Sequence, residues 1–91
     1  MQQIETVLGS RNKIKLLRFL SANRDWQFNI SEISKKIKID KGALSRIIKE
    51  LEQKEVIMIK RSGKLLLFKL NEKNSLVTNL IIPLFEKEEE K

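Results

Sequence analysis

Apolar side chains recur at helical spacing in the first third of the chain, directly after a residue that can cap a helix. Ser10 suits an N-cap, because its hydroxyl oxygen can accept a hydrogen bond from an amide group in the first turn of a helix. The apolar positions that follow form one wide stripe: Ile14, Leu16, Leu17, Phe19 and Leu20. This pattern predicts an amphipathic helix over residues 11–22.

Two further helices with a short link between them are predicted in the middle of the chain. Asn29 and Glu32 have the spacing of a capping box, so a short helix is expected at about residues 30–36. Asp40 can cap the next helix. The buried face of that helix repeats at i, i+3, i+4 and i+7: Leu44, Ile47, Ile48 and Leu51. Because only about three residues separate the two helices, the pair has the dimensions of a helix-turn-helix.

The last third of the chain predicts a β-hairpin and one more helix. Residues 56–60 and 64–70 are rich in side chains suited to strands, and residues 61–63 separate them. A last helix is expected at about residues 75–87, interrupted at Pro83, which has no amide hydrogen to donate. The predicted fold class is therefore mainly α with a small β-hairpin, an α+β arrangement.

The length of 91 residues suits one domain with one hydrophobic core. We expect an N-terminal segment at residues 1–9, a three-helix core with its hairpin at residues 10–74, and a C-terminal helix with an acidic tail at residues 75–91.

Positive charge is concentrated in the middle of this chain. The net charge is +7, and residues 35–64 contain ten bases and four acids. Such an excess creates a field that attracts polyanions. Nucleic acid is therefore the first candidate partner.

The chain has neither cysteine nor histidine. It consequently lacks thiolate and imidazole metal ligands and the usual general base near neutral pH. We expect no catalytic activity, no metal and no cofactor. No apolar run approaches the length of a membrane span and the start does not look like a signal peptide, so we expect no membrane association and a cytoplasmic protein.

The predicted order of elements, together with four short segments, resembles the small archaeal and bacterial winged helix-turn-helix regulators of the ArsR-like and MarR-like superfamily. The segments are Leu-Gly-Ser-Arg at 8–11, Phe-Asn-Ile-Ser-Glu-Ile at 28–33, Leu-Ser-Arg-Ile-Ile-Lys-Glu-Leu-Glu at 44–52 and the junction at 70–77. The resemblance spans residues 8–85. It implies a winged-helix domain that binds double-stranded DNA and regulates transcription, with residues 56–70 as its wing.

Two positions depart from the resembled pattern. Related sequences carry glycine in the turn between the second and third helices and just after the third helix, whereas this chain has Lys38 and Glu55 there. Either the turn geometry differs, or each residue adopts a left-handed conformation at a cost of about 1 kcal/mol.

The resemblance places the third helix in the major groove of DNA. The expected contacts from this helix are Lys41, Gly42, Ala43, Ser45, Arg46 and Lys49. Arg46 is the best candidate for a base contact, because a guanidinium can bond guanine through two donors. The wing is expected to clasp phosphates or a minor groove through Arg61, Ser62, Gly63 and Lys64. The second helix is expected to contact phosphates through Ser31, Lys35 and Lys36, and the turn after it through Lys38. The alternative is that these are ordinary solvated surfaces.

A three-helix core of this size cannot bury every apolar residue near the two ends of the chain. The surplus predicts a homodimer interface: Ile4, Val7, Leu8, Leu76, Val77, Leu80, Ile81, Leu84 and Phe85. The alternative is that the last helix packs on its own domain. We expect Trp26 to pack in the core at the base of the wing rather than to serve as a stacking platform for single strands.

The leading interpretation is a sequence-specific regulator that binds double-stranded DNA as a homodimer. A protein-interaction adaptor and a nonspecific architectural DNA-binding protein remain the alternatives. The basic charge argues against the adaptor. A binding selection from random duplexes would separate the sequence-specific regulator from the nonspecific architectural protein.

Overall fold

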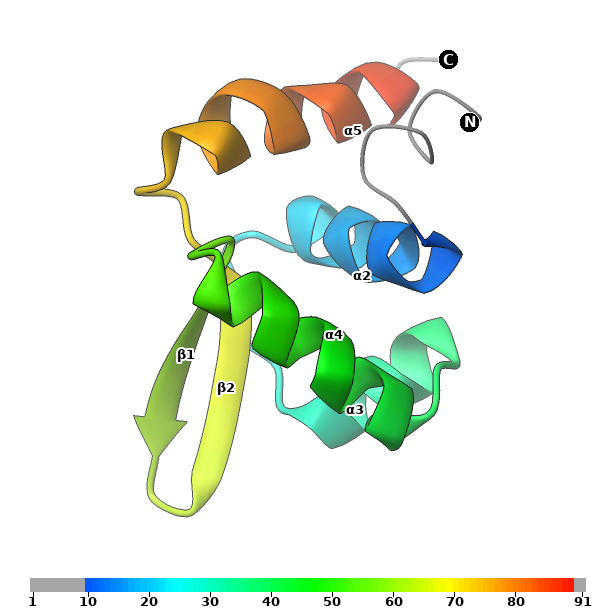
Figure 1. Cartoon of the computed structure of the whole chain (residues 1–91), viewed down its shortest axis with the longest axis vertical. Coiled ribbons are helices and arrows are strands. Elements are labelled where there is room, and N and C mark those ends of the chain that lie inside the picture. The colour runs from blue at the N-terminus through cyan, green and yellow to red at the C-terminus, as the bar shows by residue number, and fades with distance from the viewer. Residues whose placement is uncertain (1–9, 90–91) are drawn as a thin grey trace.

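The computed structural model describes residues 10–89 and has the predicted order of elements (Figure 1). The helices are α2 (Arg11–Ala22), α3 (Ile30–Ile37), α4 (Lys41–Gln53) and α5 (Ile82–Glu89), with a π-helical segment, η1 (Val77–Ile81), directly before α5. The strands are β1 (Ile57–Ser62) and β2 (Leu65–Leu70). The winged-helix arrangement is therefore confirmed within these residues.

The predicted N-caps define where the first three helices begin. The Ser10 hydroxyl accepts a hydrogen bond from the Lys13 amide at 3.2 Å. Asn29 and Glu32 form a complete capping box, in which each side chain accepts from the other residue's amide at 2.9 Å. Asp40 accepts from the first-turn amides of α4. Local side chains thus satisfy amide groups that would have no partner within the helices.

The wing is a two-stranded antiparallel sheet whose turn is shorter than the sequence predicts. Ser62 pairs with Leu65, so the turn consists of Gly63 and Lys64, and Arg61 belongs to β1 instead of the loop. Gly63 has a φ of 61°, a conformation that glycine adopts without steric strain. The prediction that residues 61–63 separate the strands is therefore wrong by two residues.

Helix α2 lies between α5 on one side and α3 and α4 on the other (Figure 1). The core residues from these helices and from the base of the wing include Leu16, Leu17, Leu20, Ile33, Leu44 and Leu70, all at most 1% exposed. A single central helix therefore joins the two ends of the domain, and any change in its packing reaches both.

Trp26 does not pack in the core, and the sequence prediction for it is wrong. Its side chain is 67% exposed. Phe28 takes the expected place instead: its backbone forms a bridge with Phe68 of β2, and its ring centroid lies 4.8 Å from that of Phe19. Because the Phe28 amide and carbonyl both bond to Phe68, residue 28 is locked beside the wing, while Trp26 remains in the preceding turn.

The last helix packs on its own domain. Val77, Ile81 and Phe85, which the sequence predicts in the dimer interface, are at most 2% exposed and belong to the core. Their burial corrects that assignment, because they are not accessible to a second chain. Leu76 and Leu80 are 47% and 41% exposed and Leu84 is half-buried. Ile4, Val7 and Leu8 lie outside the described residues.

The interruption expected at Pro83 takes the form of a widened turn. The Ile82 amide donates to the carbonyl of Val77, five residues earlier, which is the hydrogen bond of a π-helix. A proline ring collides with the carbonyl four residues before it in a regular α-helix, and a wider turn relieves that collision.

Both substitutions for glycine adopt left-handed backbone conformations. Lys38 has a φ of 57° and Glu55 a φ of 61°. The turn geometry is therefore retained, and the backbone strain is accepted at both positions. The side-chain amides of Asn71 and Asn74 each donate a hydrogen bond to the Glu55 carbonyl at 2.9 Å. These two bonds hold Glu55 in place.

Candidate nucleic-acid interface

Helix α4 has one buried and one exposed face, as its sequence pattern predicts. Leu44, Ile48 and Leu51 are buried. Ala43 is half-buried against the core. The other residues of α4 that are predicted to contact DNA lie on the exposed face: Lys41, Gly42, Ser45, Arg46 and Lys49. The exposed face therefore carries three cations and small residues near its N-terminus.

Gly42 lies close to the capping side chain of α4. A Cβ atom at this position would be 2.9 Å from Oδ2 of Asp40, which accepts the Gly42 amide at 2.9 Å. A larger side chain would therefore displace the cap. Glycine keeps the first turn of the helix both capped and open to an approaching ligand.

An ion pair joins α2 to α4 at the edge of the core. Nζ of Lys13 donates a hydrogen bond to Oε2 of Glu50, and Nζ of Lys54 lies 3.5 Å from the same oxygen. The hydrogen bond and positive charge of Lys13, with the charge of Lys54, hold the pKa of Glu50 below its ordinary value. The sequence does not predict this contact, because its two partners are 37 residues apart and no local pattern links them.

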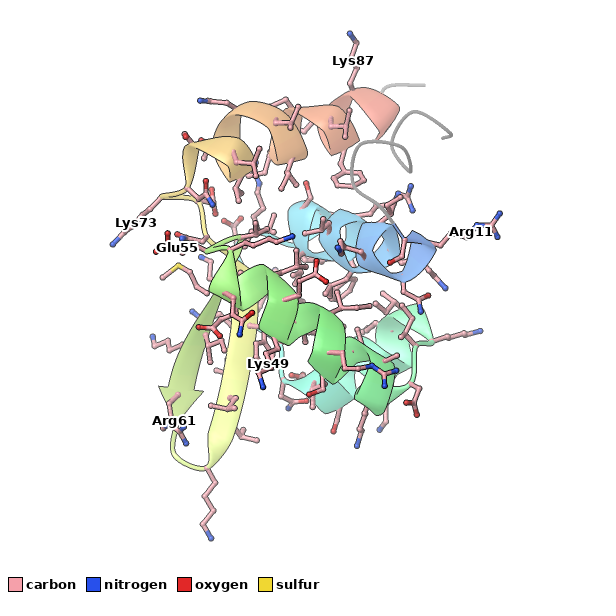
Figure 2. All side chains as sticks on the ribbon, in the orientation of Figure 1. Arg11, Lys49, Glu55, Arg61, Lys73 and Lys87 are labelled. Carbon is pink, nitrogen blue, oxygen red and sulfur yellow. The ribbon has the colours of Figure 1, made fainter. Side chains whose placement is uncertain are left out.

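The wing tip is exposed and lies at the same end of the molecule as α3 and α4, opposite α5 (Figure 1). Figure 2 shows Arg61 near the tip and Lys49 on α4. Ser62, Gly63 and Lys64 are also exposed. The structure thus brings the cations of two separate predicted contact regions to one end of the domain.

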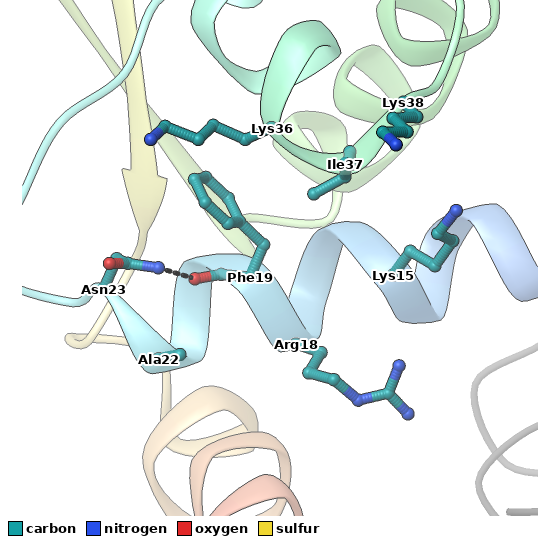
Figure 3. Close-up of a pocket in the computed structure, with 8 residues that line it drawn as sticks. All are labelled: Lys15, Arg18, Phe19, Ala22, Asn23, Lys36, Ile37 and Lys38. Carbon is teal, nitrogen blue, oxygen red and sulfur yellow. Dashed lines mark hydrogen bonds between the residues drawn. The ribbon is translucent and has the colours of Figure 1, made fainter.

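The four residues predicted on and after α3 do not form one surface. Ser31 is half-buried, whereas Lys35 is exposed. Lys36 and Lys38 line a groove between α2 and α3 (Figure 3). Their ammonium groups are therefore placed differently from those on the exposed face of α4, a distinction that helical periodicity alone did not make.

The part of the chain that the structure describes has neither a metal site nor a membrane-spanning helix. Residues 10–89 contain no group of three His, Cys, Asp or Glu side chains that could hold a metal ion. None of the helices within these residues is long and apolar enough to cross a membrane.

Comparison with known families identifies the helix-turn-helix and the first strand of the wing. Residues 10–63, more than half of the chain, match the MarR family. The chain belongs to the MarR family. This MarR-family protein is a winged-helix DNA-binding transcription regulator, which confirms the fold and the general function predicted from the sequence. The comparison with curated proteins found no match.

Solved structures of MarR-type regulators share the fold. MepR, a transcription regulator of a multidrug efflux pump of Staphylococcus aureus, has 17% identity and a TM-score of 0.76, with 98% of this chain and 67% of MepR covered. The adhesin competence repressor AdcR of Streptococcus pyogenes has 15% identity and a TM-score of 0.70, with 89% of this chain and 57% of AdcR covered. A MepR mutant bound to an oligodeoxyribonucleotide has 16% identity and a TM-score of 0.74, with 98% and 67% covered. This chain therefore spans about two thirds of MepR and less of AdcR.

Proposed function

We propose that this MarR-family protein is a cytoplasmic homodimer that binds a palindromic duplex, with α4 in the major groove and the wing on the backbone or in the adjacent minor groove. Bound dimer would block or recruit RNA polymerase. The observation that carries the proposal is the convergence of the exposed basic face of α4 and the basic wing tip at one end of the domain, opposite α5.

The two regions would have different tasks at the DNA. Arg46 is exposed on α4 and has the planar donor geometry that discriminates guanine in the major groove. Lys41, Lys49 and Lys64 supply charge that binds any sequence by releasing counterions from phosphates. The buried face of α4 and the cap at Asp40 hold the helix that carries Arg46.

The homodimer rests on the apolar surface that remains on the last helix. Leu76 and Leu80 are one helical repeat apart, are both more than 40% exposed, and are followed by half-buried Leu84. A row of exposed leucines on one helix suits a twofold contact between identical chains. Such a contact would set two copies of α4 about 34 Å apart, the spacing of successive major grooves.

Selection from random duplexes, followed by anisotropy titrations at two salt concentrations, tests the proposal. We expect a palindromic motif and an affinity that falls as salt rises, because several phosphates are neutralised. No binding at low salt, or a salt slope near zero, would disprove duplex binding. Binding without any recovered motif would instead identify a nonspecific architectural protein.

The dimer is tested by Leu80→Lys, which places a charge in the proposed contact. We expect sedimentation to show monomers and the affinity for a palindromic duplex to drop to that for a half-site. Thr78→Lys adds the same charge at another exposed position of the same helix and is the matched control. If both variants remained dimers, the dimer interface would not include this row of leucines.

A further inference from the structure

The wing holds most of the large apolar side chains that residues 10–89 expose. Seven such side chains are exposed in this part of the chain, and four of them lie on β1 and β2: Met58, Ile59, Leu65 and Leu66. Single exposed apolar residues are common on protein surfaces, but four on one hairpin form a patch, and such patches usually mark contact surfaces. The predicted wing contacts with DNA, at residues 61–64, include none of the four.

Leu65 is the most exposed apolar residue of the wing, at 52%, and it directly follows the turn of Gly63 and Lys64. The register places Ser62 opposite Leu65. Directly opposed residues of an antiparallel pair point to the same face, so the neighbour across the hairpin is too small to cover the leucine. Gly63 has no side chain, and a Cβ atom there would meet nothing within 4 Å. Leu65 therefore projects from a slender tip.

The other face of the hairpin is the one that packs on the domain. Ile57, Phe68 and Leu70 are buried there. Side chains alternate between the two faces of a strand, so Leu65 lies on the face that is turned away from the core. Folding of the domain thus leaves this leucine in water, and its burial requires a partner.

Cations flank Leu65 on both faces of the hairpin. Lys64 precedes it in the turn, Lys60 lies in the next pair along the same face, and Arg61 lies on the opposite face. All three are exposed, and residues 57–70 contain no Asp or Glu. An apolar side chain surrounded by positive charge is complementary to a partner with phosphates outside and apolar surface within, which describes a DNA duplex better than an apolar protein surface.

We propose that Leu65 enters the minor groove as a wedge between two base pairs and bends the duplex, while Arg61 and Lys64 contact the phosphates on either side. The minor groove is about 6 Å wide, which suits a tip without bulky side chains around the leucine. Phosphates offer nothing to an apolar side chain, and the faces of stacked bases become accessible only where a step opens. Leucine is among the residues that proteins insert into such steps. The wedge rests on the proposed binding of a duplex and adds Leu65 to its contacts.

A wedge would read the sequence through the stiffness of the DNA. A flexible pyrimidine–purine step such as TA or CA opens more easily than a step in a stiff A-tract. The wing tip and α4 lie at the same end of the domain (Figure 1), so the opened step would flank the bases that α4 contacts. The motif recovered by selection should therefore contain a TA or CA step at that place, although the wing donates no hydrogen bond to its bases.

Fluorescence resonance energy transfer between the ends of a duplex of about 30 base pairs that carries the selected motif measures the bend. We expect the parent protein to raise the transfer efficiency, and to increase the fluorescence of 2-aminopurine placed at the flexible step. Leu65→Thr keeps a residue suited to a strand but removes the wedge, so it should lose most of both signals and bind about tenfold more weakly. Leu65→Phe should restore both signals. An unchanged bend in Leu65→Thr would overturn the proposal.

Two further variants separate the wedge from general effects of the wing. Met58→Thr alters an exposed apolar residue on the same face, two pairs away from Leu65, and should leave the bend and the affinity unchanged. Lys64→Ala should lower the salt slope by about 1 and keep the bend, because a phosphate contact does not open a step. Thermal unfolding verifies that each variant folds. An equal loss of the bend in Met58→Thr would refute a role specific to Leu65.

Exchange of the flexible step for an AA step within the motif gives an independent readout. The affinity of the parent protein should fall about fivefold, because the stiffer step opens less easily. Leu65→Thr opens no step, so its affinity should be the same for both duplexes. Equal losses in the parent protein and in Leu65→Thr would show that another residue reads this step, and the wedge would be wrong.

The alternative occupant of the apolar patch is a second copy of the chain, which sedimentation without DNA detects. If Leu65→Thr changes the oligomeric state while the parent protein leaves the duplex straight, the wing is a protein interface and the proposal is wrong. A parent protein that binds the selected duplex without bending it would refute the wedge and leave the proposed function intact. Failure to bind any duplex would refute both.

Discussion

The two ends of this domain are built differently. At one end, the solvent-exposed surfaces of α3, α4 and the wing carry cations. Local caps define where these two helices begin. At the other end, η1 and α5 bury Val77, Ile81, Ile82 and Phe85, and leucines beside them are exposed. The basic end can therefore be understood from short stretches of sequence, whereas the α5 end depends on which of its apolar residues the rest of the fold covers.

The largest expected effect tests whether α5 is part of the fold or only an appended dimer arm. Phe85→Ala should lower the free energy of unfolding by about 3–5 kcal/mol, because Phe85 is buried against α2. Leu80→Ala, measured in dilute protein, should lower it by less than about 1 kcal/mol, since that leucine is exposed. Denaturant titrations measure both. Similar losses of unfolding free energy in both variants would show that the buried and exposed sides of the last helix contribute alike to the fold.

At the basic end, two side chains of α4 should affect DNA binding in different ways. Arg46→Ala should reduce the binding free energy for the selected duplex by about 1–3 kcal/mol and relax the protein's preference at one base pair. Lys49→Ala should weaken binding to all duplexes alike and reduce the salt slope by about 1. Anisotropy titrations on selected and scrambled duplexes give both quantities. Identical behaviour of the two variants would show that α4 does not read bases.

A smaller effect is expected where the two left-handed residues hold the turns. Lys38→Gly and Glu55→Gly should each raise the free energy of unfolding by up to about 1 kcal/mol, because glycine relieves the strain at positive φ. Lys38→Ala and Glu55→Ala, which retain the strain, are the controls. If glycine and alanine gave equal stabilities, no strain would be stored. Lys38→Gly should nevertheless weaken duplex binding, which would separate stability from function at the basic end.

The smallest effect concerns the ion pair that joins α2 to the basic end. The folded pKa of Glu50 lies below its ordinary value, so the pair stabilises the fold above the ordinary carboxyl pKa and is lost as pH falls through the folded pKa. Glu50→Gln should therefore lower Tm slightly at neutral pH and match the parent protein in strong acid. Glu52→Gln, on an exposed residue of the same helix, is the control. A difference that persisted in strong acid would indicate a packing change instead.

The elements and their order follow from the sequence alone, because the signals that define them are local. Ser10, Asn29 and Asp40 accept amide hydrogens within three residues of themselves, and the spacing of Leu44, Ile48 and Leu51 needs only the geometry of a helix. The cations of α4 and of the wing tip were predicted in the same way. Their assignment to DNA contact remains a prediction that binding measurements must decide.

Which apolar and charged residues meet depends instead on how the helices and the wing pack together. Phe28 lies beside the wing and Trp26 in solvent because backbone bonds to Phe68 fix one residue and leave the other in a turn. Lys13 finds Glu50, and Lys36 and Lys38 line the groove with Lys15, across contacts between different helices. Burial depends on the neighbours that folding brings together, and no periodic pattern within one helix contains that information.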